Sequence, residues 1–132
     1  MKFTKRSILL SFLAAIILFS CKNNNSTKEK LVKTWKMVGM GGEGAKRFPD
    51  SIKQLMYGTR FMEFREEGDM IATSSGISQM QRGDYTISDN GKTLITSRNG
   101  RASDTMTINK LTNDTLILSI KAAKLELTWV PK

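Results

Sequence analysis

Histidine and cysteine, two residue types that often perform catalysis, are nearly absent from this chain. The sequence of 132 residues contains no His and a single Cys, Cys21. A Ser/His/Asp or Cys/His nucleophilic site would therefore lack its base. A zinc site of the Cys/His type would lack its ligands, and no disulfide can form within the chain. We expect no catalytic residue, no resident metal and no cofactor, and hence no enzymatic activity.

Methionine is the residue type whose chemistry needs the closest look. Its side chain is soft and unbranched, so it can fill an irregular core or adapt to the shape of an apolar ligand. Core filling is the simpler interpretation. Copper(I) bound by thioethers is disfavoured, because no His or Cys supports it and the methionines are not closely spaced. Apart from Met1 they are Met37, Met40, Met56, Met62, Met70, Met80 and Met106.

The charged residues indicate a solvated surface more than a site. The formal net charge is +9. Glu66, Glu67 and Asp69 surround Gly68 in a predicted turn, where carboxylates are ordinarily solvated, so a cation site is not expected. Basic residues of the second half are not interleaved with aromatic residues, which argues against nucleic-acid binding. These basic residues are Arg82, Arg98, Arg101, Lys121 and Lys124.

The first twenty residues have the character of an export signal. Lys2, Lys5 and Arg6 are followed by an apolar run over residues 8–19. A transmembrane helix needs about 20 apolar residues, so this shorter run fits the hydrophobic region of a secretory signal peptide. We therefore predict a signal peptide over residues 1–20.

The end of this run carries the one cysteine. Residues 18–21 read LFSC, an order that resembles the lipobox of bacterial lipoproteins. The resemblance implies that the Cys21 thiol takes a diacylglyceryl group, that the chain is cut before Cys21, and that the new amino terminus is acylated with a fatty acid such as palmitate. The alternative is an ordinary signal peptide with an incidental cysteine.

A flexible tether is predicted to follow the anchor. Residues 22–30 (KNNNSTKEK) contain no apolar side chain and so gain little from becoming ordered. We therefore divide the chain into a signal peptide (1–20), a tether with lipidated Cys21 (21–30) and one domain (31–132). No acidic run, the surface-export cue of some lipoproteins, follows Cys21. This favours an outer-membrane location facing the periplasm over one at the cell surface.

The remaining chain alternates apolar and polar residues in short segments, which is typical of half-buried strands. Turn residues separate the segments, including Asn90-Gly91 and Asn99-Gly100, and Asn-Gly between alternating residues is a strong hairpin signal. One short helix is predicted near residues 51–57, within the only long connection. The predicted strands cover residues 31–40, 59–65, 70–74, 80–88, 93–97, 105–111, 115–121 and 124–130.

Short connections between all later strands predict an eight-stranded antiparallel up-and-down barrel. Closure removes the exposed edges of such a sheet, whereas an open sandwich usually needs longer crossovers. Four segments support this all-β fold by resemblance. Residues 33–37 (KTWKM) resemble the Gly-x-Trp signature of lipocalins. Residues 64–68 (FREEG), 85–94 (YTISDNGKTL) and 108–116 (INKLTNDTL) resemble hairpins of small lipocalin-like lipoproteins of Gram-negative bacteria.

Successive side chains of a strand point to opposite faces of the sheet. If Trp35 faces the barrel interior, this alternation predicts which other side chains face it too. We expect a ligand to contact Trp35, Met37, Met62, Phe64, Tyr85, Ile108, Leu118 and Leu127. The same face holds Met70, Ile87, Leu94, Met106, Leu116, Ile120, Leu125 and Trp129.

The predicted helix has one apolar face. Ile52, Leu55 and Met56 recur at helical spacing and need an apolar surface to cover. The long connection of a lipocalin-like barrel lies over its mouth, so these residues are predicted to form a lid. The alternative is a plug over a filled barrel.

Two kinds of function fit these features. The first is a membrane-anchored lipocalin-like lipoprotein that binds a small apolar or amphipathic ligand in its barrel. The second is a filled barrel that acts through its surface, as an envelope interaction protein or an inhibitor. We expect a monomer that contacts a membrane through its lipid anchor.

Overall fold

The structure is a computed structural model that describes residues 25–75 and 80–132, without the side chains at 102 and 103. The predicted signal peptide (1–20) and the predicted lipidation site Cys21 lie outside the described residues.

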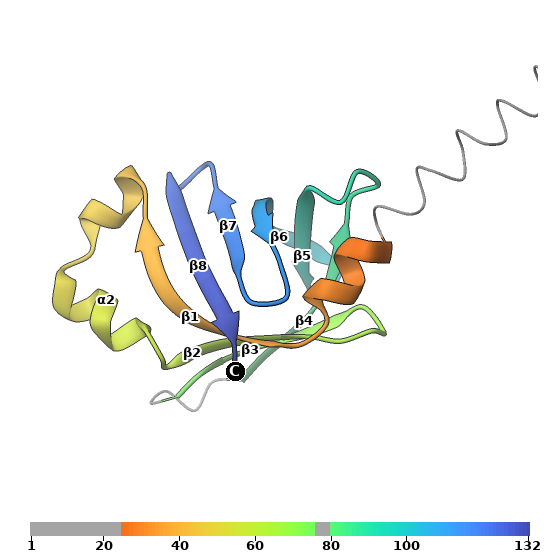
Figure 1. Cartoon of the computed structure of the whole chain (residues 1–132), viewed down its shortest axis with the longest axis horizontal. Coiled ribbons are helices and arrows are strands. Elements are labelled where there is room, and N and C mark those ends of the chain that lie inside the picture. The colour runs from red at the N-terminus through yellow and green to blue at the C-terminus, as the bar shows by residue number, and fades with distance from the viewer. Residues whose placement is uncertain (1–24, 76–79) are drawn as a thin grey trace, which may run out of the picture.

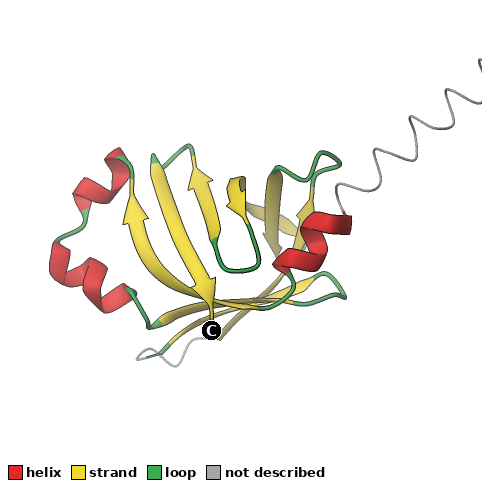
Figure 2. Ribbon diagram, in the orientation of Figure 1, coloured by secondary structure: helices red, strands yellow, loops and turns green. Residues whose placement is uncertain are grey.

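Eight antiparallel strands close into a single barrel, as predicted (Figures 1 and 2). Each strand pairs with its neighbour in sequence, and β8 pairs with β1, which leaves no open edge in the order of the sheet. The strands are β1 (Thr34–Gly41), β2 (Arg60–Phe64), β3 (Asp69–Ser74), β4 (Met80–Ile87), β5 (Thr93–Arg98), β6 (Arg101–Leu111), β7 (Leu116–Ile120) and β8 (Leu125–Pro131).

Turn chemistry fixes the hairpins. In the β5–β6 hairpin, Arg98 pairs with Arg101 across a two-residue loop. Both loop residues have positive φ, 54° at Asn99 and 74° at Gly100. This is the conformation that the tightest hairpin turns require and that Asn-Gly adopts readily, so the prediction from Asn99-Gly100 is confirmed.

The connection between β1 and β2 contains two short helices rather than the single one predicted. The first, η1, is a 3₁₀ turn over Glu43–Arg47, and the second, α2, covers Asp50–Met56. The Gly44 N–H donates a 2.8 Å hydrogen bond to the carbonyl oxygen of Lys124. A Cβ on Gly44 would lie only 2.0 Å from the carbonyl oxygen of Ala123. The unpredicted η1 therefore depends on a close backbone contact with the β7–β8 turn.

A helix also replaces most of the predicted flexible tether. Residues 25–31 are helical, and the Val32 N–H donates to the carbonyl oxygen of Lys28 at 3.0 Å. The physical reason lies at the end of this helix, where Leu31 is fully buried in the barrel core. One apolar side chain thus fixes a polar segment against the domain.

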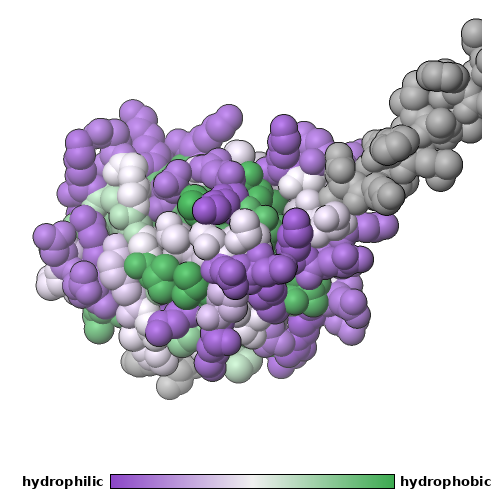
Figure 3. Space-filling view, in the orientation of Figure 1, coloured by the Kyte–Doolittle hydropathy of each residue, from purple (hydrophilic) through white to green (hydrophobic). Residues whose placement is uncertain are grey.

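The interior face assigned by alternation is confirmed by burial. Twelve of the sixteen residues assigned to it are buried, and Ile87, Ile108 and Ile120 pack against them in part, whereas Leu125 is only half-buried. The face of the molecule drawn in Figure 3 is mostly hydrophilic, with separate apolar patches. The buried twelve are Trp35, Met37, Met62, Phe64, Met70, Tyr85, Leu94, Met106, Leu116, Leu118, Leu127 and Trp129.

The up-and-down topology gives the barrel two different ends. We call the end with the β1–β2, β3–β4, β5–β6 and β7–β8 connections the mouth end. The end with the other three connections is the filled end, and Leu31 packs there against Trp35. The helix of residues 25–31 and α2 lie on opposite sides of the molecule (Figure 1).

Candidate functional site

The barrel contains a cavity of about 370 Å³ toward its mouth end. Methionine side chains form much of the apolar wall, contributed by β1, β2, β3 and β6. The wall also includes Ile120, Leu127 and Trp129. Three other methionines lie elsewhere: Met40 and Met56 pack on the core from outside the buried cluster, and Met80 is exposed. The wall methionines are Met37, Met62, Met70 and Met106.

The other half of the barrel is packed. Trp35, Phe64 and Leu116 are essentially without solvent contact. The rings of Phe64 and Tyr85 meet edge to face, with centroids 5.1 Å apart and an interplanar angle of 85°, a favourable aromatic arrangement. The barrel is therefore filled at one end and hollow at the other.

This division separates the eight residues predicted to contact a ligand. Met37, Met62 and Leu127 line the cavity. The other five do not: Trp35, Phe64, Tyr85, Ile108 and Leu118 belong to or pack against the filled core. Ligand contact by any of the eight residues remains a prediction. A ligand in the cavity would contact the three residues that line it.

Polar side chains at the mouth were missed by the sequence prediction. Arg60 lies two residues before Met62 on β2, and Arg98 lies two residues after Thr96 on β5. Both therefore continue the inward face, and both line the cavity. Extending the alternation to the strand ends, rather than stopping at the last apolar residue, would have found them. The remaining polar wall includes Ser74, Gln81, Arg82 and Asp104.

One polar group deeper in the cavity wall has no partner. Trp129 is 4% exposed, and its indole N–H makes no hydrogen bond within the described parts of the chain. A buried N–H without an acceptor costs about 1–3 kcal/mol. This part of the cavity wall is therefore apolar except for one hydrogen-bond donor without a partner, the indole N–H of Trp129.

The predicted lid does not cover the cavity. Ile52 and Leu55 are 42% and 66% exposed, and no residue of α2 lines the cavity. Only Met56 packs on the core, from the end of the helix. The expected apolar cover is therefore wrong for Ile52 and Leu55.

Hydrogen bonds to β1 hold the end of α2 in this position. The Tyr57 hydroxyl accepts a hydrogen bond of 3.0 Å from the Met40 N–H, and the Gly58 N–H donates to the carbonyl oxygen of Met37 at 3.0 Å. These bonds hold the C-terminal end of α2 beside β1, and α2 lies at the side of the barrel (Figure 1). In this position Ile52 and Leu55 are exposed.

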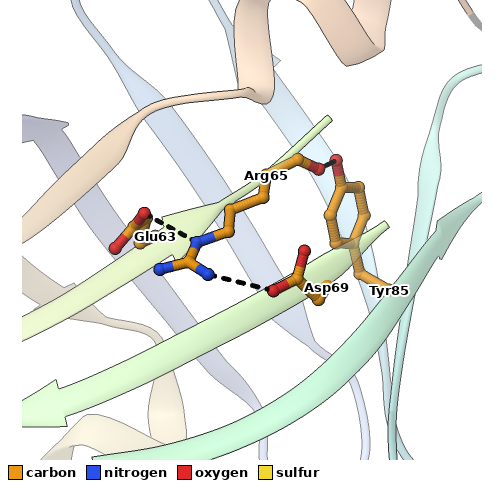
Figure 4. Close-up of polar contacts among 4 residues, drawn as sticks. All are labelled: Glu63, Arg65, Asp69 and Tyr85. Atoms are coloured by element: carbon orange, nitrogen blue, oxygen red, sulfur yellow. Dashed lines mark hydrogen bonds and ion pairs between the residues drawn. The ribbon is translucent and has the colours of Figure 1, made fainter. Parts of the chain in front are cut away.

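The acidic turn at the filled end has a structural role. Arg65 donates from Nε to Glu63 at 2.9 Å and from Nη1 to Asp69 at 3.4 Å. These carboxylates raise the pKa of the Arg65 guanidinium above its ordinary value. The Tyr85 hydroxyl donates to the carbonyl oxygen of Arg65 at 2.5 Å, which ties the hairpin to β4 (Figure 4).

Neither a metal site nor a membrane-spanning helix is found in the described part of the chain. No group of three or more His, Cys, Asp or Glu residues could hold a metal ion among residues 25–75 and 80–132. In the same ranges, no helix is long and apolar enough to cross a membrane.

The family assignment follows from the sequence match over the barrel. The family model of the lipocalin-like domain matches residues 31–118, which include β1 to β6, η1, α2 and part of β7. The chain belongs to the lipocalin-like domain family. This confirms the resemblance noted in the hairpin motifs, and it agrees with the observed closed barrel.

Solved structures share the same lipocalin-like fold. A lipocalin-like protein from Bacteroides uniformis ATCC 8492 is similar with a TM-score of 0.56 and 13% identity, over 78% of this chain and 99% of that one. A DUF4847 family protein from Bacteroides vulgatus ATCC 8482 gives a TM-score of 0.55 and 10% identity, over 76% and 92%. No curated protein matches this chain.

Proposed function

We propose that this lipocalin-like domain binds a small apolar or amphipathic molecule in the mouth half of its barrel. The observation that supports this is the cavity of about 370 Å³ lined by four methionines. Ligand sites of small molecules are mostly apolar hollows of about 300–1,000 Å³ with a few polar groups. Methionine walls suit ligands of variable shape because the thioether side chain changes conformation at low cost.

Filling the cavity tests the proposal. In the purified protein, an apolar probe such as decanol should change tryptophan emission at stoichiometric ratio, because Trp129 lies in the cavity wall. Met106→Trp should abolish binding by occupying the space. Thr105→Trp is the matched control, since Thr105 is the exposed neighbour on the outer face of the same strand. Because the variants add a tryptophan, the response of both is measured by isothermal titration calorimetry. A response that survives Met106→Trp would place the probe elsewhere and refute binding in the cavity.

We also propose that the domain is held at the periplasmic face of the bacterial outer membrane by acyl chains on Cys21. The support is the LFSC order at the end of an apolar run too short to span a bilayer. Each buried CH₂ of an acyl chain contributes about 0.8 kcal/mol, so two or three chains give a stable anchor. Cys21→Ser should leave an uncut precursor without lipid. Normal cleavage and membrane retention of that variant would refute the anchor.

A surface role is the second candidate. It is favoured by the packed half of the barrel and by exposed apolar side chains at Val38, Ile52, Leu55 and Met80. It would make the domain an envelope interaction protein or an inhibitor, with no enzymatic activity and as a monomer. Absence of any probe response, with the fold intact, would leave this role in place of ligand binding.

A further inference from the structure

We infer that the ligand of this cavity is an amphipathic anion, whose apolar part lies against the methionine wall and whose anionic group is bound by Arg60 and Arg98 at the mouth. The inference rests on the proposed function and adds the charge class of the ligand. The shared chemistry is a carboxylate, phosphate or sulfate group attached to an apolar chain.

The two arginines line the same cavity from different strands. Arg60 follows the inward alternation of Met62 and Phe64, and Arg98 follows that of Leu94 and Thr96. Both belong to the cavity lining, although they come from strands β2 and β5, which are not neighbours in the sheet. A ligand with its apolar part among the methionines therefore has an arginine on each of two separate walls near its outer end.

The charged side chains of the cavity lining are mostly basic. It contains three arginines, Arg60, Arg82 and Arg98, and one carboxylate, Asp104. By strand alternation, Arg82 lies on the outer face with its paired residue Ile71, so Arg60 and Arg98 are the cations directed inward. Asp104 pairs with Thr96 at the same end. The lining is net positive, which attracts an anionic group and repels a cationic one.

Both arginines have hydrogen-bond donors that no side chain of the described residues occupies. Within the described residues, Arg60 makes no side-chain hydrogen bond or ion pair. The Arg98 Nη2 group donates to Gln81 Oε1, which holds one edge of the guanidinium and leaves its other donors for a ligand. A guanidinium donates two parallel hydrogen bonds to a carboxylate or phosphate, and such charged bonds are stronger than neutral ones.

A neutral ligand would leave this arrangement unused. The methionine wall alone would bind decanol and decanoate equally, because their chains have the same apolar surface. Charged hydrogen bonds at the mouth instead predict a preference of about tenfold or more for the anion. The preference should fall with added salt, because the mouth is open to solvent and surface charges are screened.

A matched ligand series tests the inference in the purified protein. Tryptophan emission is titrated with decanoate, decyl phosphate, decyl sulfate, decanol and decylamine. We expect the anions to bind at least about tenfold more tightly than decanol, and decylamine to bind most weakly. The relative affinities of decanoate and decyl phosphate then distinguish a free fatty acid from a phosphate-bearing lipid as the source of the anionic group.

Three variants assign the preference to the two arginines. Arg60→Gln and Arg98→Gln should each lower decanoate affinity about tenfold while decanol affinity stays the same. Arg47→Gln is the control, since Arg47 carries the same charge in the β1–β2 connection at the same end of the barrel but does not line the cavity. It should leave decanoate binding unchanged.

The outcomes separate this inference from the proposed function. Equal binding of decanol and decanoate would overturn the anion inference and leave the binding function standing. An anion preference lost in Arg47→Gln but kept in Arg60→Gln and Arg98→Gln would overturn it in favour of general surface attraction. Failure of every probe to bind would refute the proposed function and the inference together.

Discussion

The indole N–H of Trp35 donates a hydrogen bond of 2.9 Å to the carbonyl oxygen of Leu31, and both residues are fully buried. This bond joins the end of the helix over residues 25–31 to the first strand of the barrel. It satisfies the polar atom of Trp35 inside the core, whereas Trp129 has no such partner in the described chain. Both tryptophans are buried, but only the indole N–H of Trp35 is hydrogen-bonded.

The first prediction compares these two side chains. Trp35→Phe should destabilise the protein more than Trp129→Phe by about 1–2 kcal/mol, because only Trp35 loses a hydrogen bond. Both variants lose similar apolar volume, so the difference in unfolding free energy, measured by urea denaturation, isolates the bond. Trp35→Ala should cost about 3–5 kcal/mol. Equal losses for the two Phe variants would contradict the stated difference.

The second prediction concerns the helix that replaced the tether. Leu31→Ala should lower the unfolding free energy by about 2–5 kcal/mol, the range for a buried leucine. Leu55→Ala should change it by less than about 0.5 kcal/mol, because Leu55 is 66% exposed. Circular dichroism checks that both variants keep the barrel. A neutral Leu31→Ala would show that the helix is not held by its apolar end.

The third prediction concerns alkaline pH. Burial, with smaller effects of Asp69, Glu67 and Glu66, raises the pKa of Tyr85 above its ordinary value of 10.0. The folded state therefore keeps the phenol proton longer than the unfolded state. The contribution of Tyr85 to stability is complete below pH 10 and is lost as the pH rises through the raised folded pKa.

Tyr85→Phe provides the comparison. It loses the bond to the Arg65 carbonyl oxygen, so at pH 7 it should be about 1 kcal/mol less stable than the unaltered protein. Above pH 10 the gap should narrow, because only the unaltered protein has a buried phenol to ionise. Denaturation curves between pH 7 and a strongly alkaline pH measure the gap. A constant gap across that range would contradict the prediction.

The fourth prediction uses two glycines of the mouth end. Gly44→Ala should destabilise the protein by about 1–3 kcal/mol, because the new Cβ would meet the Ala123 carbonyl oxygen at 2.0 Å. Gly41→Ala is the control, since no heavy atom beyond Gly41 and its two chain neighbours lies within 4 Å of the added Cβ. Thermal denaturation of the two variants decides the matter. Similar melting temperatures would mean that η1 moves freely away from the β7–β8 turn.

The strands, their hairpins and the set of side chains that face the interior could be predicted, because each depends on residues close in sequence. Alternation assigned Trp35 and Trp129 to one interior, and Asn99-Gly100 specified a two-residue turn. The helix over residues 25–31 could not be predicted in this way. Its formation depends on Leu31 reaching a core built by strands far along the chain.

The site was predicted only in part. Period two identifies which side chains face inward but does not say where the interior is full. Three of the eight predicted ligand contacts line the cavity, because the packing of Trp35, Phe64 and Tyr85 fills the other end. Arg60 and Arg98 were missed because only apolar residues were taken as interior candidates. The position of α2 depends on hydrogen bonds to β1 that no local pattern specifies.

The placement of the helix over residues 25–31 bears on the side from which the proposed ligand would enter the cavity. This helix is joined to the filled end through Leu31, whereas the cavity is lined by residues of the opposite end. With the proposed acyl chains on Cys21, only a few residues before this helix, the bilayer would hold the domain by its filled end. The mouth would then face away from that bilayer, so a ligand would be exchanged with molecules across the aqueous space and not drawn from the membrane to which the protein is attached.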